Sequence, residues 1–227
     1  MALQVRGLSA VRAGRIILHP TDLSLARGAR IGLVGPSGSG KSTLCHALID
    51  RLRADGIAVA HVPQSPDEAL DPLRRLDFHW RQAERALGLS PDADRREQLL
   101  CALGLEGRPL NVRPWSWSRG MQQRFVIALA LLARPNLLIL DEPTSALDPV
   151  IAAATLALVE AHLAATGTTL LIVTHDLGLA AARAGRLLVL HDGRIVEDAP
   201  TAELLARPVS PPARALVAHR NWAELSC

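Results

Sequence analysis

The sequence predicts an α/β fold, a mostly parallel sheet with helices on its faces. Three observations predict it. Short apolar runs alternate with helical stretches, one run leads through a glycine-rich loop into a helix, and another ends in two adjacent carboxylates. The chain of 227 residues, 49% of them apolar, is long enough to bury a core, so we expect one folded domain over residues 1–227.

The predicted core begins with a buried strand over residues 30–34, an apolar run directly before the glycine-rich loop. Residues 41–53 follow the loop and predict a helix, and residues 57–62 predict the next strand. The first part of the core is therefore strand, loop, helix and strand.

A helical subdomain is predicted between about residues 67 and 133. The segment is charged, prolines interrupt it, and its apolar residues recur at helical spacing around residues 80–87 and 95–103. Residues 119–133 predict a longer helix at its end.

The second half alternates strands and helices, the pattern of parallel strands joined by helices. Asp192-Gly193 predicts a two-residue turn between the last two strands, and the tail after Pro200 predicts helix in patches. The elements are strands 137–140, 169–173, 187–190 and 194–197, and helices 149–165 and 177–182.

Composition limits the classes of protein that are expected. A net charge of +3 with scattered arginines forms no basic patch, so we expect no nucleic-acid partner. Cys45, Cys101 and Cys227 form no CxxC pair, which indicates a reducing compartment without disulfides or a zinc site. The longest uninterrupted apolar run, residues 125–133, is much shorter than the ~20 residues that cross a bilayer, and the N-terminus has no signal-peptide core. We expect a cytoplasmic protein that only another chain could hold at a membrane.

The segment GPSGSGKST over residues 35–43 carries the clearest chemistry, a full GxxxxGK[ST] motif between a predicted strand and a predicted helix. Its glycines let backbone N–H groups approach phosphate oxygens, and the helix aims its positive dipole end at the same place. All but one of the 25 basic residues are arginine, and the exception is Lys41, which we expect to reach the β- and γ-phosphates. The predicted nucleotide-binding residues of this loop are Gly35, Pro36, Ser37, Gly38, Ser39, Gly40, Lys41, Ser42 and Thr43.

Asp141 and Glu142 follow the apolar run 137–140. Taken alone, two carboxylates there also fit a solvated strand end. Together with the phosphate loop they indicate magnesium binding and water activation. We expect the Ser42 hydroxyl to ligate magnesium, Asp141 to hold the ion less directly, and Glu142 to polarise the attacking water as general base, a role worth ~10²–10⁴ in rate. These features define a P-loop NTPase.

Four further segments resemble the ATP-binding cassette (ABC) ATPase family, in that family's order and spacing. Gln64 resembles its Q-loop glutamine, and the segment SRGMQQR, which contains Ser118 and Gly120, is similar to its signature motif. The segment SALD ending at Asp148 resembles its D-loop, and His175 resembles its switch histidine.

The resemblance covers nearly the whole chain and implies a RecA-like P-loop core. Residues 1–66 and 134–227 would form this core with an antiparallel β subdomain, and the helical subdomain would carry the signature motif. The implied activity is hydrolysis of ATP with Mg²⁺ as cofactor. Family members normally have extra strands between the phosphate loop and the Q-loop, and only about twenty residues separate Thr43 from Gln64, so we expect an abbreviated β subdomain.

The resemblance also implies roles for single residues. Gln64 contributes to the magnesium site, His175 contacts the γ-phosphate, and Asp148 lies at the nucleotide. Ser118 and Gly120 of one subunit close over ATP held by the phosphate loop of another. A second ATPase subunit is therefore an implied partner.

Two residues depart from the family pattern. Arg119 replaces a glycine of the signature motif, adding bulk and charge beside the γ-phosphate of the opposed site, where it either strengthens the ATP contact or obstructs it. Arg12 stands where an aromatic residue usually stacks on adenine. Either its guanidinium stacks instead, or adenine stacking is lost.

Within the family, three segments resemble the peptide/nickel importer group: QSPDEALDP from Gln64, PWSWSRGMQQR from Pro114, and the tail RP…ARAL from Arg207. The resemblance implies two membrane permease subunits and, for an importer, an extracytoplasmic substrate-binding protein. It places the chain peripherally at the cytoplasmic face of the cell membrane. Two other classes stay open: a non-transport cytosolic ABC ATPase acting on nucleic acid or ribosomes, and a P-loop kinase for a small metabolite. Trp115 and Trp117 either face a partner or wedge the helical subdomain onto the core.

Overall fold

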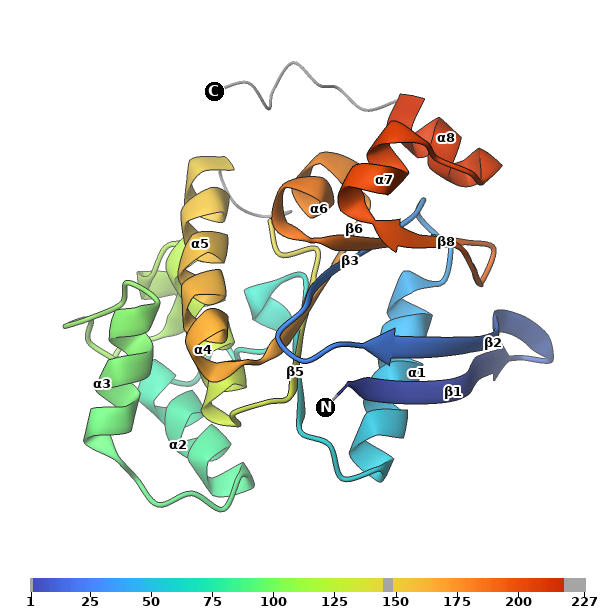
Figure 1. Ribbon diagram of the computed structural model, residues 1–227. Coiled ribbons are helices and arrows are strands. Elements are labelled where there is room, and N and C mark those ends of the chain that lie inside the picture. The colour runs from blue at the N-terminus through green and yellow to red at the C-terminus, as the bar shows by residue number, and fades with distance from the viewer. Residues whose placement is uncertain (1, 145–148, 219–227) are drawn as a thin grey trace.

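The computed structural model describes residues 2–144 and 149–218. Its centre is a six-stranded sheet in the order β4-β5-β6-β3-β7-β8, in which all neighbours are parallel except the β7–β8 pair (Figure 1). The sequence analysis predicted this parallel sheet. The strands are β3 (Arg30–Val34), β4 (Val59–Val62), β5 (Leu137–Asp141), β6 (Thr169–Thr174), β7 (Arg186–His191) and β8 (Arg194–Pro200).

The side chains of the central strands alternate between two hydrophobic clusters, as the two-residue period of a strand requires. In β5, Leu137 and Ile139 belong to one cluster, and Leu138 and Leu140 to the other. Both faces of the sheet are therefore buried, which explains the continuous apolar runs in the sequence.

One face is covered by α1 (Lys41–Ala54) and by a two-stranded antiparallel hairpin of β1 (Leu3–Arg12) and β2 (Arg15–Leu25), at the right of Figure 1. The sequence analysis predicted no strand there. Register shifts interrupt the β1–β2 pairing, so the apolar alternation that marks a regular strand is broken. No strand lies between α1 and β4, as expected for an abbreviated β subdomain.

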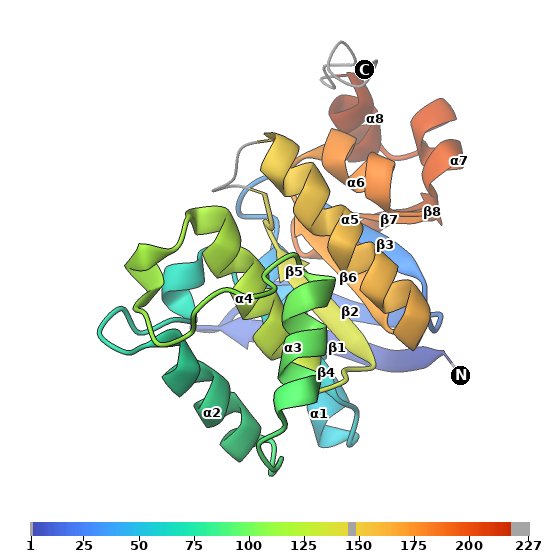
Figure 2. The same ribbon diagram turned by 90° about the vertical axis from the view of Figure 1, so that its left-hand side faces the viewer.

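The other face is covered by helices whose aromatic residues meet. Trp117 packs edge-on against Phe125 at 5.6 Å between ring centroids, and Trp80 lies at 6.2 Å from the same ring. Trp117 is thus part of the core, whereas Trp115 is 58% exposed. The helices in this layer are α2 (Leu76–Ala86), α3 (Ala93–Ala102), α4 (Arg119–Leu132) and α5 (Pro149–Thr166), with 3-10 turns η1 (Pro66–Glu68) and η2 (Pro114–Ser116); Figure 2 shows α3 and α4 beside α5.

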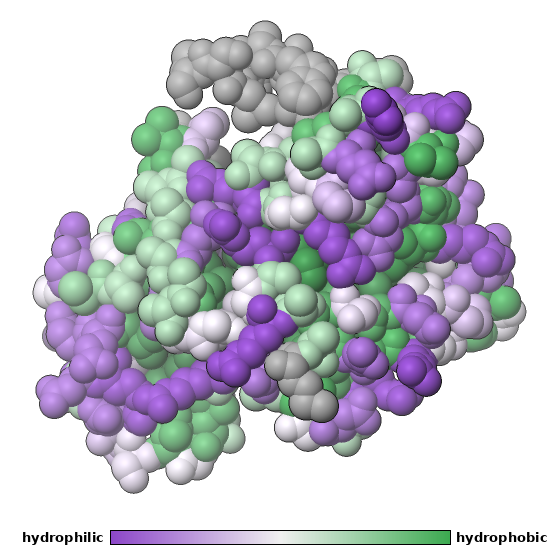
Figure 3. Space-filling view, viewed as in Figure 1, coloured by the Kyte–Doolittle hydropathy of each residue, from purple (hydrophilic) through white to green (hydrophobic). Residues whose placement is uncertain are grey.

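By length and composition α5 is apolar enough to span a membrane. Its residues Leu156, Val159 and Leu163, spaced as one helical face, are buried in the core beside α4. On the same helix Glu160 pairs with Arg30 at 3.4 Å, so α5 is a helix of this domain. Its outward face is rich in alanine and is pale green in Figure 3.

In the C-terminal part, α6 (Leu177–Arg183) packs against β3 and β6, and α7 (Thr201–Ala206) and α8 (Pro211–Ala218) pack against the β7–β8 end of the sheet. Glu197 on β8 anchors the start of α8, because its carboxylate accepts hydrogen bonds from the backbone N–H of Val209 and from the N–H and hydroxyl of Ser210. Partial burial opposes ionisation, but these bonds outweigh it and hold the pKa of Glu197 below its usual value.

Candidate functional site

Four neighbouring strands bring the predicted site residues to one edge of the sheet. Gly35 follows β3, Gln64 follows β4, Asp141 ends β5, and His175 follows β6. Because these strands are parallel, their carboxyl ends meet at one edge, the usual place of ligand sites in open α/β sheets.

The phosphate loop has a backbone that only glycine can supply. A Cβ on Gly35 would lie 2.2 Å from the Leu190 carbonyl oxygen, and Gly38 and Gly40 have φ of 79° and 102°. The loop leads into α1 at Lys41, and no acidic residue lies in the first turn of that helix. The segment therefore fits the phosphate groups of a nucleotide, with free N–H groups and the positive helix end directed to one place.

Lys41 lies inside the loop. Its Nζ donates to the carbonyl oxygens of Gly35 at 2.8 Å and Pro36 at 3.0 Å. Burial lowers its pKa, while the nearby charges of Glu142 and Asp141 act in the opposite direction. The ammonium is thus held among the loop carbonyls, close to two acidic residues.

Gly193 braces the phosphate loop from the β7–β8 turn, a role that the sequence analysis did not find. Its N–H donates to the Ser39 carbonyl oxygen and its carbonyl accepts from the His19 N–H, both at 2.9 Å. A Cβ at this position would lie 2.2 Å from the Ile17 carbonyl oxygen. Gly193, which was predicted only as a turn residue, therefore also connects the β7–β8 turn with β2 and with the phosphate loop.

Asp141 is 18% exposed at the end of β5, and burial raises its pKa. His61 Nε2 lies 4.0 Å from its carboxylate, and burial lowers the pKa of that imidazole. The ring of His46 lies edge-on to His61 at 6.0 Å between centroids. The sequence analysis assigned no role to His46 or His61, because nothing in their spacing marks a shared site.

Glu142 is held by β6. Its backbone has a left-handed φ of 44°, and its N–H donates to the Val173 carbonyl oxygen at 2.8 Å. Its carboxylate accepts hydrogen bonds from the Thr174 hydroxyl at 2.9 Å, from the His175 N–H at 3.0 Å and from His175 Nδ1 at 2.8 Å. The structure thus joins the predicted base directly to the predicted switch histidine. Thr174, which the sequence analysis did not single out, is thus one of the donors to the Glu142 carboxylate.

The remaining predicted residues lie on other elements or, for Gln64, at the exposed end of β4 on the same edge of the sheet. Arg12 is exposed at the end of β1, and Gln64 is exposed after β4. Ser118 is the N-cap of α4, and its hydroxyl accepts from the Met121 N–H at 3.3 Å, while Gly120 is buried. Asp148 and the rest of the predicted D-loop fall outside the described residues.

The signature helix packs beside the edge strand that lies farthest from the phosphate loop. Gln123 on α4 donates to the Pro63 carbonyl oxygen, directly after β4, at 3.4 Å. In the sheet β4 is separated from β3 by three strand spacings, roughly 14 Å. The signature helix is therefore attached to a different strand from the one that leads into the phosphate loop.

Arg119, the first residue of α4, forms an ion pair within its own chain. Its Nη1 lies 2.6 Å from Oδ1 of Asp67 in η1. The sequence analysis did not foresee this contact, which joins residues 52 positions apart.

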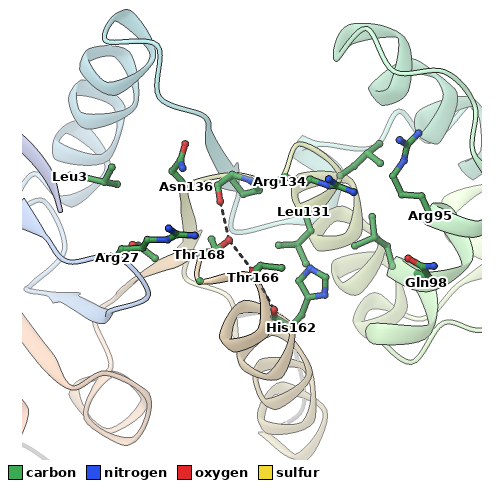
Figure 4. Close-up of a pocket in the computed structure, with 15 residues that line it drawn as sticks. Leu3, Arg27, Arg95, Gln98, Leu131, Arg134, Asn136, His162, Thr166 and Thr168 are labelled. Carbon is green, nitrogen blue, oxygen red and sulfur yellow. Dashed lines mark hydrogen bonds between the residues drawn. The ribbon is translucent and has the colours of Figure 1, made fainter. Parts of the chain in front are cut away.

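A cavity of about 630 Å³ lies at the opposite edge of the sheet, at the amino ends of β5 and β6 (Figure 4). Arg134 and Arg27 line it at the C-terminal ends of α4 and α5, where a Cβ built on Gly167 would lie 3.3 Å from Arg27 Nε. Cations at helix C-termini compensate the negative end of the helix dipole. The cavity contains none of the predicted site residues.

The arrangement matches known proteins. A family model described as ABC transporter matches residues 18–145. Over 95% of its length the chain is 38% identical to the nickel import ATP-binding protein NikD of Rhodospirillum rubrum and 37% identical to NikD of Pseudomonas putida, and covers 94% of each. An ATP-binding subunit of an ABC transporter superposes with a TM-score of 0.77 at 27% identity, over 96% of this chain and 98% of that one. A dimeric ATP-binding cassette bound to ADP and phosphate superposes with a TM-score of 0.71 at 25% identity, over 88% of this chain and 99% of that one.

Proposed function

The chain belongs to the ATP-binding subunits of ABC transporters, and from this premise we propose how its residues divide the work of hydrolysing Mg-ATP. Loop residues 35–43 hold the phosphates through their N–H groups, and Lys41 exchanges its two carbonyl partners for the β- and γ-phosphate oxygens. The fit of Gly35 against Leu190 supports this assignment, because it leaves the loop no room for a side chain.

Ser42, Gln64 and Asp141 would hold magnesium, an ion that prefers oxygen ligands. When bound, the ion neutralises charge on the β- and γ-phosphate oxygens. Burial raises the pKa of Asp141, so a cation beside it would favour the ionised carboxylate.

Glu142 acts as the general base that takes a proton from the attacking water. The observation that carries this assignment is the clamp on its carboxylate by Thr174 and His175. Three donors fix the direction of the carboxylate before substrate arrives, and preorganisation of this kind is what positions a base. His175, with its side chain 70% exposed, is free to contact the γ-phosphate as well.

The test is Glu142→Gln in the assembled transporter. We expect Mg-ATP binding to remain and hydrolysis to fall by ~10²–10⁴, because the amide cannot accept the proton. Glu160→Gln on α5 is the matched control, since its carboxylate pairs with arginines away from the site. Turnover of Glu142→Gln above about a tenth of wild type would contradict the assignment.

The ATP site is completed by a second ATPase subunit. Ser118 and Gly120 lie at the start of α4, a helix that is attached through Gln123 to the end of β4 and not to β3, the strand that leads into the phosphate loop; in this proposal they serve the nucleotide of the partner. Two permease subunits receive the motion of the closed pair, and they hold the chain peripherally at the cytoplasmic face of the membrane. Cell fractionation tests the location: the chain should sediment with membranes only when the permeases are co-expressed, and sedimentation without them would contradict it.

The transported substrate is nickel or a nickel chelate, delivered by an extracytoplasmic binding protein. The support is the similarity to NikD proteins, at 34–38% identity over 95% of the chain. Uptake of radioactive nickel by cells carrying the wild-type chain, with Glu142→Gln as inactive control, tests it. Uptake of peptides in place of nickel would overturn the substrate and leave the ATPase assignment intact.

A further inference from the structure

Arg119 and Asp67 connect two segments that are distant in sequence. Asp67 belongs to η1, which begins two residues after Gln64, and Arg119 opens the signature helix α4. Their charged groups meet at 2.6 Å, although the two side chains are 46% and 64% exposed. The chain therefore ties its signature motif to its own Q-loop segment at an accessible surface.

The start of α4 presents several donors at this surface. Within the part of the chain that the structure describes, the N–H groups of Arg119 and Gly120 have no hydrogen-bond partner, and the guanidinium of Arg119 lies beside them. Of these donors, only the guanidinium of Arg119 contacts an anion within the described chain, the carboxylate of Asp67.

The γ-phosphate of ATP competes for the same guanidinium. It carries more charge than a carboxylate and offers three oxygens to a planar guanidinium, which forms strong paired hydrogen bonds with phosphate. An exposed ion pair contributes only about 0.2–1 kcal/mol, so phosphate can displace Asp67.

We propose that Arg119 is a phosphate ligand in trans that Asp67 restrains until ATP arrives. In the open chain Asp67 holds the guanidinium; on closure the γ-phosphate bound by the partner subunit takes its place. The inference rests on the proposed shared site, and it resolves the role that the sequence left open, because Arg119 then strengthens the ATP contact.

Opening of the Arg119–Asp67 ion pair would also connect ATP binding at α4 with the segment that follows Gln64. The bond from Gln123 to the Pro63 carbonyl oxygen does not involve Arg119, so α4 stays attached to the end of β4 when the ion pair opens. Closure on the partner's ATP thereby removes one tie between α4 and η1, next to Gln64, while the bond from Gln123 keeps the helix attached to the end of β4.

The test compares two variants in the assembled transporter through the Mg-ATP concentration that gives half-maximal hydrolysis. Asp67→Asn frees Arg119 and should lower this concentration by about 1.4- to 5-fold, the range of an exposed ion pair. Arg119→Gln should raise it by at least as much, and Arg119→Lys should restore part of the loss. In the double variant Asp67→Asn should have no further effect, because no guanidinium is left to release.

Asp77→Asn is the matched control, since it removes an exposed ion pair with Arg81 on α2 that touches no site residue. If the ion pair were merely structural, Asp67→Asn and Arg119→Gln would change the Mg-ATP concentration for half-maximal hydrolysis in the same direction, and that result would overturn the proposal. An unchanged concentration for Asp67→Asn would also overturn it. Normal hydrolysis by Lys41→Ala would instead count against the proposed function, so the two failures are distinguishable.

Discussion

Gly193→Ala should loosen the phosphate loop from outside the motif. The added Cβ would lie 2.2 Å from the Ile17 carbonyl oxygen, whereas real contacts of this kind are at least 3.0 Å long, so the turn or β2 must move. Such movement breaks the hydrogen bonds of Gly193 to His19 and Ser39, and the second of these holds the loop.

The loss of folding stability in Gly193→Ala has two parts. A left-handed alanine costs about 1–2 kcal/mol, and each lost hydrogen bond about 1 kcal/mol, which gives roughly 3–4 kcal/mol of stability. For a domain of this size about 2–4 °C of melting temperature is lost per kcal/mol, so we expect a fall of roughly 6–16 °C.

Gly7→Ala separates the two causes. Gly7 has φ of 61°, close to the 69° of Gly193, but nothing lies within 4 Å of its Cβ position. The Gly7→Ala variant should lose only the about 1–2 kcal/mol of stability that a left-handed alanine costs, and it should keep its affinity for ATP. Melting by circular dichroism and binding of a fluorescent ATP analogue measure both effects. If the two variants melted alike and bound ATP alike, the bracing role of Gly193 would be wrong.

Lys41→Ala should lose nucleotide binding by isothermal titration, since no other lysine can meet the phosphates; tight binding would count against the loop assignment. Glu197→Gln should lower stability by roughly 1–2 kcal/mol at neutral pH. Because the folded-state pKa of Glu197 is lowered, its stabilisation is present above the ordinary pKa of about 4.3 and is lost as the pH falls through the lowered value, so the melting curves of wild type and variant should converge in acid. In a Cys227→Ser background a thiol reagent should label Cys101, which is exposed, at least about tenfold faster than Cys45, because burial raises the pKa of that thiol; equal rates would refute this.

The elements predicted correctly are those that local sequence determines. The phosphate loop follows from glycine spacing, and the signature helix starts at its N-cap Ser118 and ends at Leu132, one residue before the predicted end. Strand β5 is fully buried between the two clusters, so its apolar run alone marks it. The boundaries of the helical subdomain and the roles of the single site residues stay predictions.

The parts that were missed depend on contacts between distant residues. The strands before Arg30 were not predicted, because bulges break their alternation. The contact of Gly193 with Ile17 and the pairing of Arg119 with Asp67 are set only when separate segments come together, and nothing in their local sequence indicates the partner.

The measurement that tests the shared site most directly is ATP turnover per chain, alone and in the membrane complex, over a range of concentrations. Because we propose that the signature motif serves the nucleotide of a partner subunit, the isolated protein should hydrolyse ATP weakly. Its activity should rise when the second ATPase subunit and the permeases are present. Robust turnover by the monomer that does not change with concentration would contradict the account.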